Sequence, residues 1–152
     1  MSTSTIQARL QAINATITGV ESAPTEMPGS INKSDLPLAL SYPEEADHRT
    51  RSVKTTGPVR HWVIRVYVRP IGTGVVVDEG FSEVYPLLDA LRTEYAKVAN
   101  QGATTYWDDL ELERDDGVDV LTLHDAQPMQ GSTLPRYWGT RVHLQITGFH
   151  DE

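Results

Sequence analysis

Seven carboxylates are concentrated in one short stretch of the chain, 107–119, which reads WDDLELERDDGVD and contains a single arginine. Ca²⁺ and Mg²⁺ bind several carboxylate oxygens at once, so this stretch is a candidate cation site. Its spacing does not fit a calcium-binding helix–loop–helix loop, and Gly117 follows two aspartates as in an Asp-Gly turn between strands. We therefore favour an acidic turn or a charged interface over a metal site. The carboxylates are Asp108, Asp109, Glu111, Glu113, Asp115, Asp116 and Asp119.

The other residue types that catalyse reactions or bind metals show no motif. The five histidines, at 48, 61, 124, 143 and 150, lack the His-x-His or His-x-x-x-His spacing that brings two ligands to one metal. No nucleophile elbow, phosphate-binding loop or His-Glu-x-x-His motif occurs, and Gly72-Thr73-Gly74 lacks the third glycine of a dinucleotide fingerprint. The chain has no cysteine, which excludes thiol chemistry and disulfides. We expect no enzyme activity and no cofactor.

Positive charge is concentrated in residues 50–70, TRSVKTTGPVRHWVIRVYVRP, which hold five of the thirteen Lys and Arg residues and no acid. The whole chain has a net charge of −8, which disfavours non-specific binding to nucleic acid. A solvated strand face, with arginine stems covering apolar neighbours, would explain the pattern without any function. We favour a docking surface, on which these cations meet carboxylates of a second subunit or of another protein.

The acidic stretch is an available counterpart for this docking surface. Opposite patches on one molecule favour a head-to-tail contact, and such contacts close into rings when the rotation permits. The predicted interface residues are Arg49, just before the basic stretch, and Arg51, Lys54, Arg60, Arg65 and Arg69 within it, together with Asp108, Asp109, Glu111, Glu113, Asp115 and Asp116 from the acidic stretch.

Apolar periodicity predicts two helices that flank these charged segments. The first begins at a capping box formed by Ser4 and Gln7 and ends at Gly19. Its apolar stripe consists of Ile6, Leu10, Ile13 and Ile17. The second is capped by Ser82, with Pro86 tolerated near its first turn. Its apolar face consists of Val84, Leu88, Leu91, Tyr95 and Val98.

Alternating and proline-flanked segments predict the strands. Residues 36–42, between Pro37 and Pro43, indicate a strand near a sheet edge. In residues 61–69 a period of two indicates a strand with one face in the core. Its predicted core face is Trp62, Ile64, Val66 and Val68, and its other face is His61, Val63, Arg65, Tyr67 and Arg69. VDVLTLH and RYWGTRVHLQITGF indicate two final strands.

The element order is therefore α-β-β-α-β-β. It predicts an α+β fold with a mostly antiparallel sheet of about four to five strands and two helices packed on it. At 152 residues we expect a single domain, 1–152, with mobile loops near 20–35, 43–60 and 70–80.

The N-terminal helix, the Pro-flanked LPLALSYP, the polar loop before HWVIRVYV, the helix over the sheet and the last strand VHLQITGF together resemble a known family. They are similar to the tail-terminator proteins of long-tailed bacteriophages, also called tail-completion or tail-to-head joining proteins. The resemblance covers most of the chain in length and element order. It implies an α+β virion protein without catalytic residues or cofactor. Such a protein forms a ring, expected to be a hexamer, that caps the tail tube and joins it to the head.

The resemblance also implies partners and a location. The partners are further copies of the chain, the tail-tube protein and a head–tail connector or neck protein, with DNA only as passing cargo and no membrane. The location is the tail or neck of the virion, and the host cytoplasm before assembly. The acidic balance suits a channel through which DNA passes without sticking. The start of the chain lacks a signal-peptide pattern, and no apolar run approaches the roughly 20 residues that span a bilayer.

Two alternatives stay open at this point. The first is another virion component, either a neck protein such as a head–tail adaptor or stopper, or a tail-tube protein. The second belongs to a different class: a small cation-dependent enzyme or ligand-binding module that uses the acidic stretch.

Overall fold

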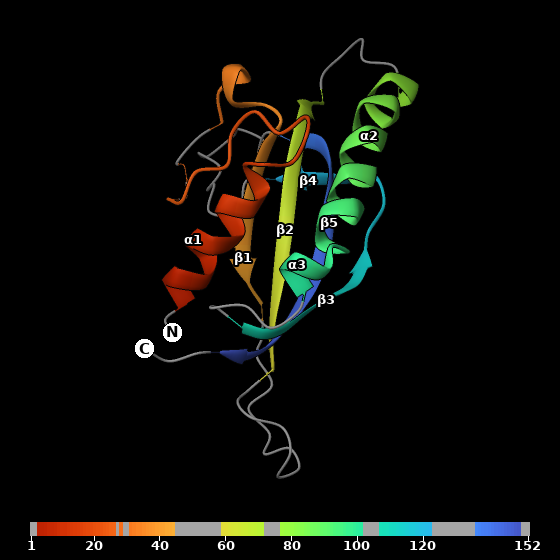
Figure 1. The fold of residues 1–152 in the computed structure, drawn as a ribbon. Coiled ribbons are helices and arrows are strands. Elements are labelled where there is room, and N and C mark those ends of the chain that lie inside the picture. Colours follow the sequence, from red (N-terminus) through yellow and green to blue (C-terminus); the bar gives the residue numbers. More distant parts are fainter. Residues whose placement is uncertain are drawn as a thin grey trace.

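The computed structural model describes residues 3–26, 28, 31–44, 59–71, 77–101, 107–122 and 136–149. Within these residues a five-stranded antiparallel sheet is covered by helices (Figure 1), which confirms the predicted α+β class. In chain order the elements are α1 (Thr3–Asn14), the 3-10 turn η1 (Lys33–Asp35), β1 (Leu38–Pro43), β2 (Val59–Pro70), α2 (Val77–Tyr95), α3 (Val98–Gln101), β3 (Trp107–Asp115), β4 (Asp119–Thr122) and β5 (Arg136–Phe149).

The long last strand, β5, organises the sheet. The strand order is β1-β2-β5-β3, and β4 also pairs with β5. β2 runs along one side of β5, while β3 and β4 occupy successive parts of its other side. Both α1 and α2 lie on the same face of this sheet (Figure 1). We call this the helix face and the opposite one the second face.

The main core fills the space between the helices and the sheet. The predicted inward face of β2 is confirmed, because Trp62, Ile64 and Val66 are buried there with the apolar stripes of α1 and α2. β2 is buried on both sides, however. Val63 and Tyr67 belong to a smaller cluster on the second face, together with Leu38, Leu40, Tyr42, Leu121 and Tyr137. The second face is therefore half apolar and half charged.

A buried polar network connects α1, β1 and α2 inside the main core. Gln11 donates to the carbonyl oxygen of Ala39 at 2.9 Å and accepts from the hydroxyl of Ser41 at 2.7 Å. Asn14 donates to Gln11 Oε1 at 2.9 Å and accepts a hydrogen bond from the hydroxyl of Tyr95. Because each polar group has a partner, the network fixes the two helices relative to the edge strand at little cost in desolvation.

The outer edge of β1 is occupied by the chain itself. The N–H of Ala39 donates to the carbonyl of Ser22 at 2.9 Å, and Gln11 caps the carbonyl of Ala39. Gln7 donates to the carbonyl of Ser41 at 3.3 Å. Pro43 has no N–H to offer at the end of the strand. The prediction of an edge strand is confirmed, and this edge has few free backbone groups for another strand.

Both predicted helix starts are wrong. α1 begins at Thr3, so Ser4 lies inside the helix, and the side-chain amide of Gln7 donates to the carbonyl of Ser41. α2 begins at Val77, which places Ser82 and Pro86 in its interior. Gly80 allows this early part of α2 to approach the sheet, because a Cβ there would lie 2.6 Å from the ring of Trp138.

The acidic stretch is a strand that the sequence pattern did not predict, and Gly117 is not the turn of a hairpin. β3 and β4 both pair with β5, so residues 116–118 form a break in one edge of the sheet. Gly117 has a φ of 64°, and its N–H donates to Asp115 Oδ1 at 3.0 Å. The predicted mobile segments near 43–60 and 70–80 lie largely outside the described residues.

Candidate interface on the second face of the sheet

The charged part of the second face is built by cross-strand neighbours of β2, β5 and β3. His61 lies opposite Gln145, which lies opposite Glu111. Four residues further along β2, Arg65 lies opposite Arg141 of β5. Cross-strand neighbours share a face, so acids and bases from distant parts of the sequence meet here.

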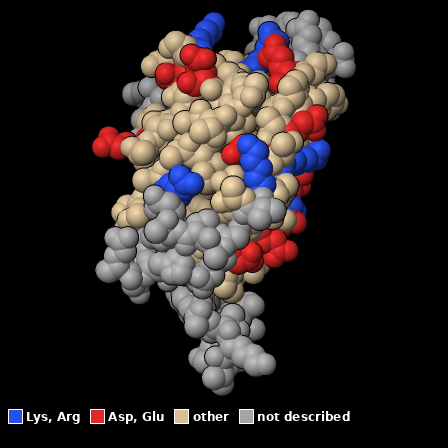
Figure 2. Space-filling view, viewed as in Figure 1, with Lys and Arg blue, Asp and Glu red and all other residues tan. Residues whose placement is uncertain are grey.

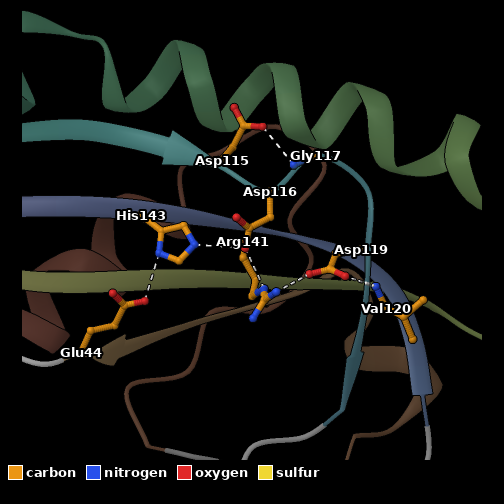
Figure 3. Close-up of polar contacts among 8 residues, drawn as sticks. All are labelled: Glu44, Asp115, Asp116, Gly117, Asp119, Val120, Arg141 and His143. Atoms are coloured by element: carbon orange, nitrogen blue, oxygen red, sulfur yellow. Dashed lines mark hydrogen bonds and ion pairs between the residues drawn. The ribbon is translucent and has the colours of Figure 1, made fainter.

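His143 lies at the centre of the charged group (Figure 3). Its Nδ1 is 3.0 Å from Glu44 Oε1, and its Nε2 is 3.1 Å from Asp116 Oδ2. Because β2 lies between β1 and β5, the Glu44 side chain reaches across β2 to make this contact. A side chain from the end of β1 is thereby tied to the break between β3 and β4.

Arg141 closes the break in the outer edge. Its Nε lies 3.0 Å from Asp116 Oδ2 and its Nη2 lies 2.6 Å from Asp119 Oδ2 (Figure 3). The N–H of Asp116 also donates to the carbonyl of Arg141 at 2.9 Å. Asp119 Oδ1 accepts from the N–H of Val120 at 2.8 Å. One arginine thus holds the end of β3 and the start of β4 against β5.

Arg65 contrasts with Arg141. It is half-buried, and its guanidinium carbon lies 5.1 Å from the ring centroid of Tyr42, in the range of a cation–π contact. Among the described residues it has no carboxylate partner, and its buried Nε has no acceptor. A buried donor without an acceptor is destabilising and calls for an explanation.

Acidic side chains without partners lie at the outer strand of the same face. Asp109 and Glu111 of β3 are exposed and, within the described part of the chain, make no ion pair. Two strand spacings and four residues separate Glu111 from Arg65, which is about 16 Å. Glu113 is bound within the chain, at 2.7 Å from His61 Nδ1. The second face therefore carries an unneutralised cation and unneutralised carboxylates that do not reach each other.

The predicted basic residues do not form one patch. Arg49, Arg51 and Lys54 lie outside the described residues. Arg60 is the cross-strand neighbour of Ile146, which is buried on the helix face. Arg69 was predicted to share a face with Arg65, and this is wrong: a register shift between Tyr67 and Arg69 places Arg69 opposite Trp138, on the helix face. There its Nη1 lies 2.9 Å from Glu83 of α2.

Asp115 also lies away from the second face, on the side of the sheet that faces α2. It lies opposite Val142 and accepts from Nε and Nη2 of Arg92 at 2.8 Å and 3.0 Å, which ties β3 to α2. The hydrogen bonds from Arg92 lower the pKa of the Asp115 carboxyl, with a further contribution from the Gly117 N–H. The same pair raises the pKa of Arg92. The side chain of Asp108 lies outside the description.

Sequence reasoning missed the residues that organise this face, namely Glu44, Asp119 as an ion-pair partner, Arg141 and His143. The alternation of Arg141 and His143 with Val142 and Leu144 showed that both point away from the core. No local pattern indicated their carboxylate partners, because those come from other strands.

The charged group is arranged for contacts between side chains more than for metal binding. No cluster of three or more His, Cys, Asp or Glu residues suited to a metal occurs among the residues that the structure describes. Each of Glu113, Asp115, Asp116 and Asp119 already faces an arginine or a histidine. Nor does any helix within the described ranges have the length and apolar character of a membrane span.

The helix face differs from the second face in its charge distribution. Figure 2 shows Lys and Arg side chains interspersed with Asp and Glu on the visible face, without a continuous patch of one sign among the residues that are coloured. The unneutralised charges that are separated by sign are therefore those of the second face. No protein-family model matches the sequence, and no curated protein is similar enough to indicate a family.

Proposed function

We propose that this chain is a non-enzymatic structural protein of the virion, a tail terminator whose copies form a ring through head-to-tail contacts. The ring, expected to be a hexamer, caps the tail tube and joins it to the head or neck. Its partners are other copies of the chain, the tail-tube protein and a neck protein, and DNA passes through without specific binding. The α+β fold is compatible with the resemblance to this family.

The observation that carries the proposal is the separation of unneutralised charges on the second face. Arg65 has no carboxylate partner among the described residues, and Asp109 and Glu111 have no cation. At about 16 Å they do not satisfy each other within one copy. A neighbouring copy that brings its β3 against β2 of the first supplies both partners at once. The contact joins different surfaces of the two copies, so repeating it generates a ring if the rotation closes.

A reciprocal charge exchange tests the contact. Native mass spectrometry should show that Arg65→Glu and Glu111→Arg each reduce self-association, alone or on added tail tubes. The double variant should restore it, because the exchanged charges again attract between copies. Asp109→Arg combined with Arg65→Glu tells which carboxylate is the partner. Unchanged assembly in both single variants would exclude this contact.

The location in the particle is tested separately. Label on this protein in purified particles should appear at the head–tail junction. Label along the tail favours a tail-tube protein, and label within the neck away from the tube end favours an adaptor or stopper. A monomer whose melting temperature rises with millimolar Mg²⁺ or Ca²⁺ would instead favour the cation-dependent module.

A further inference from the structure

His143 is a buried histidine with a carboxylate at each ring nitrogen. It is 7% exposed, and Nδ1 and Nε2 lie 3.0 Å and 3.1 Å from Glu44 and Asp116. A neutral imidazole has one N–H and donates to only one of the two carboxylates, whereas an imidazolium donates to both. Only an imidazolium satisfies both contacts in Figure 3 with an N–H donor.

The two carboxylates are held to different degrees. Asp116 is 22% exposed, and Arg141 binds its carboxylate. The N–H of Asp116 also donates to the carbonyl of Arg141 at 2.9 Å. Glu44 follows the last residue of β1, and its side chain is 37% exposed. Its N–H donates to the carbonyl of His61 at 2.7 Å. Among the described residues, its carboxylate contacts His143 alone.

We propose that His143 is a proton-operated clasp between the end of β1 and the sheet. The protonated ring holds Glu44 and Asp116 together across β2. When the ring loses a proton, the remaining N–H stays on Nε2, because Asp116 is kept in place by Arg141. The lone pair on Nδ1 then faces a carboxylate oxygen, and Glu44 is released into solvent.

Charged groups from every neighbouring element act on this clasp. Glu44 and Asp116 are the two carboxylates in contact with the ring. Among the described residues, the other titratable or charged groups on the strands around His143 are His61 and Arg65 of β2, Glu113 and Arg114 of β3, Arg141 of β5, and Asp119 through Arg141. Because Glu113 is bound to His61 and Asp119 to Arg141, Glu44 and Asp116 are the acids that respond directly to the proton on His143.

Opening of the clasp changes which charged side chains are exposed on the second face. When the ring loses its second N–H, the end of β1 loses its tie to β5. The second face gains a solvated carboxylate at the same time. The inference depends on the contacts within one copy and does not rest on ring formation.

Ring ¹⁵N NMR of the full-length chain between about pH 5 and pH 8.5 tests the clasp. We expect two protonated ring nitrogens on His143 at the acidic end and only Nε2–H at the alkaline end. Over the same range, amide exchange of Glu44, corrected for its intrinsic pH dependence, should accelerate about fivefold or more as its carboxylate is released. An Nδ1–H tautomer at the alkaline end, or a corrected exchange rate that does not change, would overturn the proposal.

Two variants sharpen the test. In Glu44→Gln the side-chain amide accepts from a protonated Nδ1 or donates to a neutral one, so the contact should persist at both ends of the pH range. In the matched control His61→Gln the pH response of Glu44 should remain as in the parent chain. A response that survives in Glu44→Gln, or disappears in His61→Gln, contradicts the assignment to His143.

Discussion

Arg65 and Arg141 are direct neighbours on β2 and β5, yet within the described ranges only Arg141 is bound by carboxylates. The two guanidinium groups therefore have different consequences for the molecule. Arg141 joins the two parts of a broken edge strand. Arg65 has no carboxylate partner among the residues that the structure describes, and a carboxylate of a neighbouring copy would supply one.

Arg65→Met should separate assembly from folding. We expect the free energy of unfolding of the monomer to stay within about 0.5 kcal/mol of the parent value or to rise, because no described ion pair is lost. Self-association should fall. Urea denaturation at low protein concentration and native mass spectrometry measure the two effects.

The matched variant is Arg141→Met, which leaves Asp116 and Asp119 without their cation. It should destabilise the monomer by about 1–3 kcal/mol. Equal losses of stability in the two variants would show that Arg65 also has a structural role.

Tyr95→Phe should weaken the contact between the two long helices. The Tyr95 hydroxyl donates to Asn14 Oδ1 in the core, so its removal leaves a buried oxygen without a donor. We expect a loss of about 1–3 kcal/mol in unfolding free energy, measured by denaturant titration. A loss below about 0.5 kcal/mol, or a gain, would mean that Asn14 finds another donor.

Burial of Tyr95 also predicts that the stability of the fold depends on pH in the alkaline range. Burial raises the pKa of the Tyr95 phenol above its ordinary value of 10.0. The unfolded state then loses this proton at lower pH than the folded state, so stability decreases as the pH rises above about 10. Thermal unfolding should decline less steeply in Tyr95→Phe than in the parent. Parallel curves would contradict this assignment.

The ion pair between Asp115 and Arg92 predicts a loss of stability at acidic pH. Arg92 lowers the pKa of its carboxyl below the ordinary 3.8, so the stabilisation is present at neutral pH and is lost as the pH falls through the acidic range. Because the Arg92 side chain is 47% exposed, we expect Asp115→Asn to cost only about 0.5–1 kcal/mol at pH 7. Its acid limb should be flatter, and Arg92→Met should reproduce both effects. A variant with an unchanged acid limb would rule out this pair as a source of acid sensitivity.

Gly139→Ala should be among the most destabilising small substitutions in the sheet. A Cβ at this position would lie 2.0 Å from the carbonyl oxygen of Val66, so β2 and β5 would have to move apart. We expect a loss of at least about 2 kcal/mol. Gly117→Ala, with no atom within 4 Å of its Cβ but a φ of 64°, should cost about 1–2 kcal/mol. The reverse order of the two losses would contradict the close approach at Gly139.

The features that follow from regular periodicity were predictable from the sequence. The core face of β2 and most of both apolar stripes appear where the pattern placed them, because burial imposes a period of 3.6 or 2 on each element. Both helices end earlier than predicted, however: α1 ends at Asn14, before Ile17 and Gly19, and α2 ends at Tyr95, so that Val98 lies in α3. The edge position of β1 followed from its flanking prolines.

The irregularities were not predictable, and the candidate interface depends on them. A bulge near Arg69 reverses the face of one arginine, and another between Leu112 and Arg114 shifts the acids of β3. Such shifts are set by the partner strand, so the local sequence carries no signal for them. β3 itself was missed, because most of its residues are charged and only a few apolar ones, such as Trp107 and Leu110, are buried.

The blocked border of β1 has a consequence for how copies can combine. With Gln7, Gln11 and Ser22 covering its backbone groups, this border is a poor template for another strand. A sheet that continues from copy to copy needs two free edges on each copy, and the β1 edge is already occupied by residues of the same chain. A fibril in which one continuous sheet runs through many copies is therefore disfavoured by the architecture of the subunit.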